Sequence, residues 1–178
     1  MTELRIIPEC YVDTKVAEIA SNSSRKYNHQ HGCGDVVREL INRKESICLG
    51  IVDEDRNKGP RAKYFLEFVD LRQENGLILK RHSVRKQYLI LICPEIEKWL
   101  MKDAIAVQIS PEDNKYGLPA NLKGFTSICK TKDIDRNEGF YRFVKHLINK
   151  NAPSITTLRS WIEQFKQDQL DLTINKHN

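Results

Sequence analysis

Long apolar runs are missing from this sequence, and glycine and proline are sparse. No stretch approaches the roughly 18 consecutive apolar residues of a membrane-spanning helix. Eight Gly and six Pro among 178 residues are too few for a collagen-like or low-complexity chain. The opening residues, MTELRIIPE, lack the basic flank and long apolar run of a secretion signal. We therefore expect a soluble, folded protein without membrane contact, located in the cytoplasm.

Several signatures of common enzyme and metal-binding classes are also absent. The five cysteines are an odd number and none has the sequence context of a thiol nucleophile, which favours a reducing compartment over a disulfide framework. No Gly-x-x-x-x-Gly-Lys-Ser/Thr loop occurs, so the chain is not itself a P-loop ATPase. No helix-turn-helix or zinc-finger signature occurs either, so any binding of nucleic acid has to use another arrangement.

The composition is that of an ordinary folded domain. Hydrophobic residues make up 40% of the chain and charged residues 30%, which supports one core within 178 residues. The 29 Lys and Arg against 24 Asp and Glu leave a net charge of +5, which suits a polyanionic partner without requiring one. We expect an α/β core over residues 1–110 and a helical extension over residues 111–178 that packs on the same domain.

Apolar periodicity predicts strands that alternate with helices. Apolar runs predict strands at residues 4–8, 47–52, 76–79 and 88–93. Helical spacing predicts helices at residues 12–20, 35–41, 64–69, 94–106, 121–129 and 139–148. Pro94 is expected in the first turn of its helix, and Ser154 is expected to cap a last helix. Aromatic residues at helical spacing in the C-terminal third are expected in the core: Phe140, Tyr141, Phe143, Trp161 and Phe165.

This alternation is typical of a three-layer, Rossmann-like α/β fold with an open, mostly parallel sheet flanked by helices. In such folds ligands bind at the carboxyl ends of the strands. Glu9 follows the first predicted strand, and Asp53 and Asp55 follow the second. We therefore expect these three carboxylates to lie close together at one edge of the sheet.

Such a group of carboxylates points to a divalent cation. Carboxylates repel one another unless protons or a cation compensate, and Mg²⁺ prefers oxygen ligands. Side chains alternate along a strand, so Asp53 and Asp55 face the same side. Cations held there polarise a phosphoryl oxygen and activate water. The expected cofactor is Mg²⁺ or Mn²⁺, with Glu9, Asp53 and Asp55 as ligands.

Two short motifs resemble those of the toprim domain of topoisomerases, primases and related nucleases. They are Ile-Ile-Pro-Glu9 before a helix and Gly50-Ile-Val-Asp53-Glu-Asp55 after an apolar strand. The resemblance covers roughly the first hundred residues. It implies that Glu9 is a metal ligand or general acid/base and that Asp53 and Asp55 coordinate Mg²⁺. The glycine that usually follows the toprim glutamate is replaced by Cys10.

A third motif, Cys93-Pro-Glu-Ile-Glu97-Lys-Trp99-Leu100, resembles the strand-to-helix junction of small stand-alone toprim-like proteins. Those proteins occur with bacterial anti-phage defence and mobile-element systems, which implies an ATPase partner. Helical spacing turns Trp99 toward the core and Glu97 toward the strand ends, so Glu97 is expected to support catalysis. Glu95 competes for that role.

Candidates for contact with nucleic acid lie in three places. His29 and His31 precede a predicted helix, whose free backbone N–H groups favour phosphate; the competing interpretation is a polar turn. Zinc is not favoured there, since His-x-His-x-Cys has no distant partner pair. Basic side chains of two further segments are expected to line a groove along a nucleic-acid backbone, the alternative being a solvated face. These are Arg56, Lys58, Lys80 and Arg81.

The leading expectation is therefore a Mg²⁺-dependent nuclease that acts on DNA or RNA. The catalytic residues are expected to be Glu9, Asp53, Asp55 and Glu97. The alternative is a non-catalytic subunit that binds nucleic acid or an ATPase and keeps the acids as a cation site. A receiver-like regulatory domain is weaker, since no phosphoacceptor Asp with a downstream Thr and Lys is found.

Overall fold

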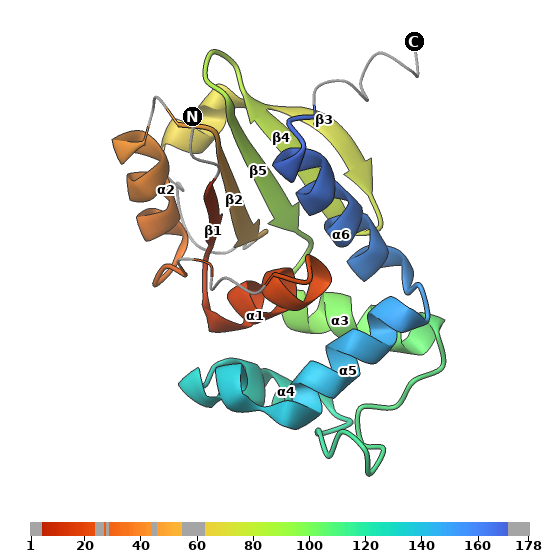
Figure 1. Cartoon of the computed structure of the whole chain (residues 1–178). Coiled ribbons are helices and arrows are strands. Elements are labelled where there is room, and N and C mark those ends of the chain that lie inside the picture. The colour runs from red at the N-terminus through yellow and green to blue at the C-terminus, as the bar shows by residue number, and fades with distance from the viewer. Residues whose placement is uncertain (1–4, 24–26, 28, 44–45, 55–62, 171–178) are drawn as a thin grey trace.

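The central element of the molecule is a five-stranded sheet in the order β1-β2-β5-β4-β3 (Figure 1). This computed structural model describes residues 5–23, 27, 29–43, 46–54 and 63–170. Strands β1, β2 and β5 are parallel, and β4 is antiparallel to both β5 and β3, so four of the five strands point the same way. The strands are β1 (Arg5–Pro8), β2 (Cys48–Asp53), β3 (Phe68–Glu74), β4 (Leu77–His82) and β5 (Gln87–Ile92).

Helices cover both faces of the sheet, which confirms the α/β fold with a mostly parallel sheet. Helix α2 packs on one face, and α1, α3 and α6 pack on the other, with α4 and α5 beyond α1 and α3 (Figure 1). The helices are α1 (Tyr11–Ala20), α2 (Cys33–Asn42), α3 (Ile96–Ala106), α4 (Leu122–Cys129), α5 (Glu138–Asn149) and α6 (Pro153–Lys166), with 3₁₀ turns η1 (Lys63–Glu67) and η2 (Lys132–Arg136). No helix within the described ranges has the length and apolarity to cross a bilayer.

Strand β2 is buried on both faces, as its continuous apolar sequence predicts. Leu49 and Ile51 contact the core on the α1 side, and Val52 contacts the core on the α2 side. Gly50 faces α2, where an added Cβ would lie 2.9 Å from Leu89 Cδ1 and 3.1 Å from Val36 Cγ1. Glycine at this position therefore lets α2 pack closely against the strand that ends in Asp53.

The C-terminal helices share one hydrophobic core with the sheet, since this core runs from Ile6 to Leu170. The core residues from Tyr116 to Leu170 thus pack in the same cluster as those of the strands. Among the aromatic residues expected in the core, four are buried, whereas the Tyr141 side chain is 40% exposed. The four buried ones are Phe140, Phe143, Trp161 and Phe165.

Local details differ from the sequence prediction at three places. The short helix predicted at residues 64–69 ends at Glu67, and residues 68–74 form β3, whose polar sequence suits an edge strand with an exposed face. Helix α3 begins at Ile96, so Pro94 precedes the helix and Glu95 is its N-cap. Helix α6 begins at Pro153, so Ser154 is a helical residue and not its cap.

The N-terminus of α6 is instead capped by a side chain from another helix. Asp103 of α3 is buried and accepts hydrogen bonds from Ser154 N (3.0 Å) and Ile155 N (2.8 Å). Its carboxylate satisfies two of the backbone N–H groups that begin a helix without partners and complements the positive helix end. Asp103 thereby attaches α6 to α3.

We expect Asp103→Ala to lower the free energy of unfolding by about 3 kcal/mol, because two buried N–H groups lose their acceptor. The comparison is Ser154→Ala, which leaves both backbone donors and Asp103 in place and should cost less than about 1 kcal/mol. Urea denaturation of both variants measures the difference. Equal losses in the two variants would contradict the capping role.

Candidate functional site: an acidic cleft at the strand ends

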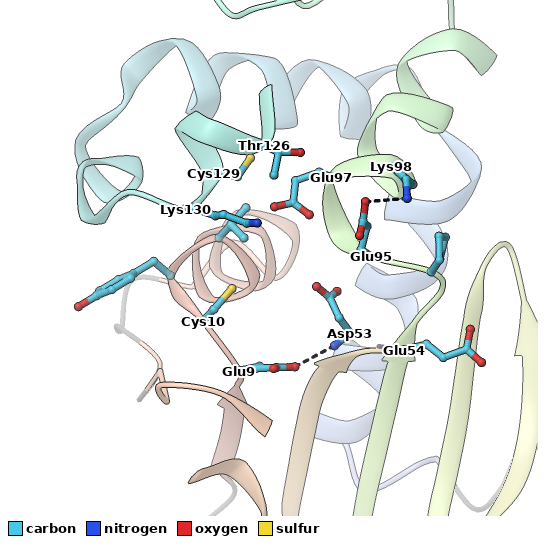
Figure 2. Close-up of a pocket in the computed structure, with 13 residues that line it drawn as sticks. Glu9, Cys10, Asp53, Glu54, Glu95, Glu97, Lys98, Thr126, Cys129 and Lys130 are labelled. Atoms are coloured by element: carbon cyan, nitrogen blue, oxygen red, sulfur yellow. Dashed lines mark hydrogen bonds and ion pairs between the residues drawn. The ribbon is translucent and has the colours of Figure 1, made fainter. Parts of the chain in front are cut away.

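A cleft of about 680 Å³ lies where the carboxyl ends of β1 and β2 meet the first turns of α1 and α3. Helix α4 closes its other side with Thr126 and Cys129 (Figure 2). Five carboxylates and two ammonium groups line it, so its wall carries mostly negative groups. They are Glu9, Asp53, Glu54, Glu95, Glu97, Lys98 and Lys130.

Glu9 connects three elements of the fold through its carboxylate. Oε2 accepts a hydrogen bond from Asp53 N at the end of β2, and Oε1 accepts one from Cys33 N at the start of α2, both at 3.1 Å. Gly32 precedes α2 with φ of 121°, a conformation that favours glycine. The N-terminus of α2, expected to offer its N–H groups to a phosphate, thus donates to the buried Glu9 instead.

Asp53 lies at the end of β2 and faces the α1 and α3 side of the sheet. It continues the alternation of Leu49 and Ile51 and points into the cleft (Figure 2). Its Oδ1 accepts a hydrogen bond from Ile96 N at 3.0 Å. Burial raises the pKa of Asp53 to about 9, with further contributions from the charges of Asp13 and Glu9. At neutral pH this carboxyl group therefore holds a proton unless a cation replaces it.

Asp13 of α1 is an acid of this site that the sequence prediction missed. Its side chain is 1% exposed, and Oδ2 accepts a hydrogen bond from Cys10 Sγ at 3.1 Å. Oδ1 has no hydrogen-bond partner among the described residues. The pKa of Asp13 is raised to about 8, mainly by burial; the charges of Glu9 and Glu97 contribute to this shift, and the Cys10 hydrogen bond opposes it.

A sequence signal for Asp13 does exist. It lies three, four and seven positions before three buried residues of α1, so it belongs to the apolar face of that helix. These residues are Val16, Ala17 and Ala20. Asp13 also lies four residues after Glu9, which directly follows a strand. Together these two features indicate a buried acid close to that glutamate.

The structure distinguishes Glu97 from Glu95. Glu97 is 6% exposed and points into the cleft, and burial followed by the charge of Glu95 raises its pKa (Figure 2). Glu95 is partly exposed and forms an ion pair with Lys98 at 3.0 Å. Glu97 is thus the α3 acid that joins Glu9, Asp13 and Asp53, and Trp99 is buried as its spacing predicts.

The residues expected to contact nucleic acid do not all gather at the cleft. His29 and His31 contact Tyr11, which lines the cleft, with ring centroids 4.1 and 6.2 Å away. Lys80 and Arg81 pair with Leu89 and Tyr88 of β5, at the opposite end of that strand from Ile92, the neighbour of Asp53. They therefore do not share a groove with the acids. Asp55, Arg56 and Lys58 lie outside the described residues.

The sequence prediction assigned no role to the two cationic groups that line the cleft. Lys130 follows α4 directly and extends toward Glu97, and its charge acts on that carboxyl group (Figure 2). Lys98 is engaged with Glu95. Lys130 is therefore placed to meet an anionic group that enters the cleft.

The donor atoms of the cleft suit a hard cation in kind. Within the described ranges, no group of three or more His, Cys, Asp or Glu side chains is arranged to hold a metal ion. The four clustered acids are nevertheless oxygen donors, and the unpaired Oδ1 of Asp13 and the raised pKa of Asp53 indicate missing positive charge. Burial raises the pKa of the Cys10 and Cys129 thiols, so both remain neutral at pH 7.

The chain matches no model of a protein family, no curated protein and no solved structure. The resemblance to toprim domains therefore rests only on the short motifs around Glu9, Asp53 and Glu97. What the site can do follows from the chemistry and placement of its own residues.

Proposed function

We propose that this chain is a toprim-like, Mg²⁺-dependent phosphodiester hydrolase that acts on nucleic acid. The observation that carries the proposal is that three acids from separate elements line one cleft and a fourth, Asp13, is buried close enough to interact with them. Glu9 follows β1, Asp53 ends β2, and Asp13 and Glu97 come from α1 and α3. Glu9 and Asp53, with the neighbouring Asp55 of the sequence, would hold the cation.

The charge of the cleft explains why the proposal includes a cation. With Asp53 protonated, the four other carboxylates still outnumber the two lysines and repel a phosphodiester, so a phosphate enters only when positive charge is added. When bound, Mg²⁺ polarises a phosphoryl oxygen and lowers the pKa of water. The chain then has to fix the reacting groups and to move protons.

The hydrogen bonds of the site support these two tasks. Backbone donors at 3.1 and 3.0 Å fix the carboxylates of Glu9 and Asp53, so these groups are oriented before a substrate arrives. Burial raises the pKa of Glu97, which suits this carboxyl group for transferring a proton to the leaving oxygen. Lys130 contacts the phosphate from the opposite side of the cleft.

A non-catalytic subunit is the second candidate. The observation that favours it is that no preformed metal-holding group exists in the part of the chain that the structure describes. In this case the acids bind a cation for structural reasons, and the chain binds nucleic acid or an ATPase partner without cutting.

The direct test incubates the purified chain with single- and double-stranded DNA and RNA in Mg²⁺, Mn²⁺ or chelator. We expect cutting of at least one substrate in a divalent cation and none in chelator. Calorimetric titration of Mg²⁺ without substrate separates the two candidates, because a cation that binds without any cutting supports the non-catalytic subunit. Neither binding nor cutting would contradict both.

A further inference from the structure

A basic groove runs along helix α5, and it shares no residue with the acidic cleft. Two depressions of about 250 and 130 Å³ adjoin there, and both are lined by Tyr141 and Lys145. The larger one extends to the loop before α4, and the smaller one extends to α1. We call this surface the α5 groove and define it by Lys15, Lys115, Tyr141, Arg142, Lys145 and His146.

Hydrogen bonds to backbone carbonyl oxygens orient two cationic side chains of the α5 groove and do not neutralise their charge. Arg142 Nε donates to the carbonyl oxygen of Lys115 at 2.8 Å, and Lys15 Nζ donates to the carbonyl oxygen of Asp135 at 2.7 Å. In the described part of the chain, neither Arg142 nor Lys145 forms an ion pair with a carboxylate. Backbone carbonyls thus orient these cations while their full charge stays available to a ligand.

Acidic groups do little to offset this charge. Glu18 is the only carboxylate that lines either depression among the described residues, and its Oε1 accepts a hydrogen bond from Tyr27 N at 2.8 Å. Lys115 is 3.5 Å from Asp113, in an exposed pair of the kind that contributes little. Burial and the charges of Lys115 and Lys150 lower the pKa of His146, which reflects a positive field around the groove.

Tyr141 adds an aromatic surface between the cations. Its side chain is 40% exposed, although Phe140 and Phe143 of the same helix are fully buried. Lys15 Nζ lies 5.9 Å from the centre of the Tyr141 ring, and Tyr141 lines both depressions. An exposed ring flanked by lysines is what a nucleobase stacks on while its phosphates contact the cations.

We propose that the α5 groove binds a single-stranded nucleic acid, with phosphates on Lys15, Lys115, Arg142 and Lys145 and a base on Tyr141. A single strand fits better than a duplex because stacking on Tyr141 requires an unpaired base. The proposal goes beyond the nuclease function and does not depend on it. Binding needs no divalent cation and none of the cleft acids.

The test measures fluorescence anisotropy of labelled single-stranded oligonucleotides, in chelator, at several salt concentrations. We expect Arg142→Ala/Lys145→Ala to lower the affinity at least about 10-fold and to reduce the slope of log affinity against log salt by roughly 1.4, or 0.7 for each lost phosphate contact. The matched control is Arg159→Ala/Lys102→Ala, which removes the same charge from exposed positions on α6 and α3. It should leave the affinity within about 2-fold of wild type.

Tyr141 provides a second, independent measurement. Tyr141→Phe keeps the ring and should bind like the wild type, whereas Tyr141→Ala should bind about 10-fold more weakly. Equal binding by the wild type and the Arg142→Ala/Lys145→Ala variant, with both folded by circular dichroism, would overturn the proposal. So would tighter binding of a duplex, an acidic peptide, an anionic vesicle or inorganic phosphate than of the single strand.

Discussion

An Asp53→Asn variant should fold like the wild type and lose at least about 1000-fold of its metal-dependent cleavage rate. Asparagine has the same shape, and its carbonyl oxygen still accepts the hydrogen bond from Ile96 N. The amide carries no negative charge, so it is a poor ligand for a hard cation. Initial rates on a labelled oligonucleotide in Mg²⁺ measure the loss, and circular dichroism verifies the fold.

The matched control for Asp53→Asn is Glu95→Gln, which removes a negative charge from the rim of the same cleft. Glu95 is partly exposed and paired with Lys98, so we expect its variant to keep its rate within about 5-fold of wild type. If Asp53→Asn cut within about 10-fold of the wild-type rate, Asp53 would not be the metal ligand proposed above. Glu9 is less suitable for this test because its carboxylate also holds the ends of β2 and α2.

The free energy of unfolding should fall as pH rises from about 5 to 9 in chelator. In the unfolded chain Asp13 and Asp53 have the ordinary pKa of 3.8, whereas in the folded chain burial raises these values to about 8 and about 9. Between pH 5 and 9 both acids are ionised in the unfolded chain but retain protons in the folded chain. Each rise in pH therefore lowers the free energy of unfolding. Above about 9 both states are ionised and the loss stops.

Asp13→Asn should flatten this pH profile, because the variant retains one proton fewer in the folded state. Urea denaturation at pH 5, 7 and 9 measures the slope for both proteins. Millimolar Mg²⁺ should restore stability at pH 9, since a cation compensates the ionised acids that protons compensate at lower pH. Parallel profiles for the wild type and the variant would show that Asp13 does not hold the buried proton.

The central strands and three of the four site acids, Glu9, Asp53 and Glu97, could be predicted from local sequence. The apolar runs that form β1, β2 and β5 are continuous because both faces are covered, and Glu9 and Asp53 follow such runs directly. Their proximity depends only on β1 and β2 being neighbours, which is usual for consecutive parallel strands. Asp13 does not follow a strand, so its position in the cluster depends on how α1 packs against the sheet, and a local apolar run does not reveal it.

The order and direction of the outer strands could not be predicted in the same way. Strand β4 runs antiparallel to β5, so Lys80 and Arg81 lie far from Asp53 although they follow it by fewer than 30 residues. Strand order depends on contacts between distant segments and not on local periodicity. Similarly, the cap of α6 is supplied by Asp103, which lies 51 residues before Ser154, so no local capping motif reveals it.

The protonated acids at the cleft also change the net charge of the whole molecule. The formal charge of +5 counts every Asp and Glu as ionised, but Asp13 and Asp53, with pKa values of about 8 and 9, carry protons at pH 7 and make the net charge about +7. If one divalent cation displaces both protons, the total charge stays the same. At pH 7, loading the cleft would then leave unchanged the long-range attraction that brings a polyanion toward α5.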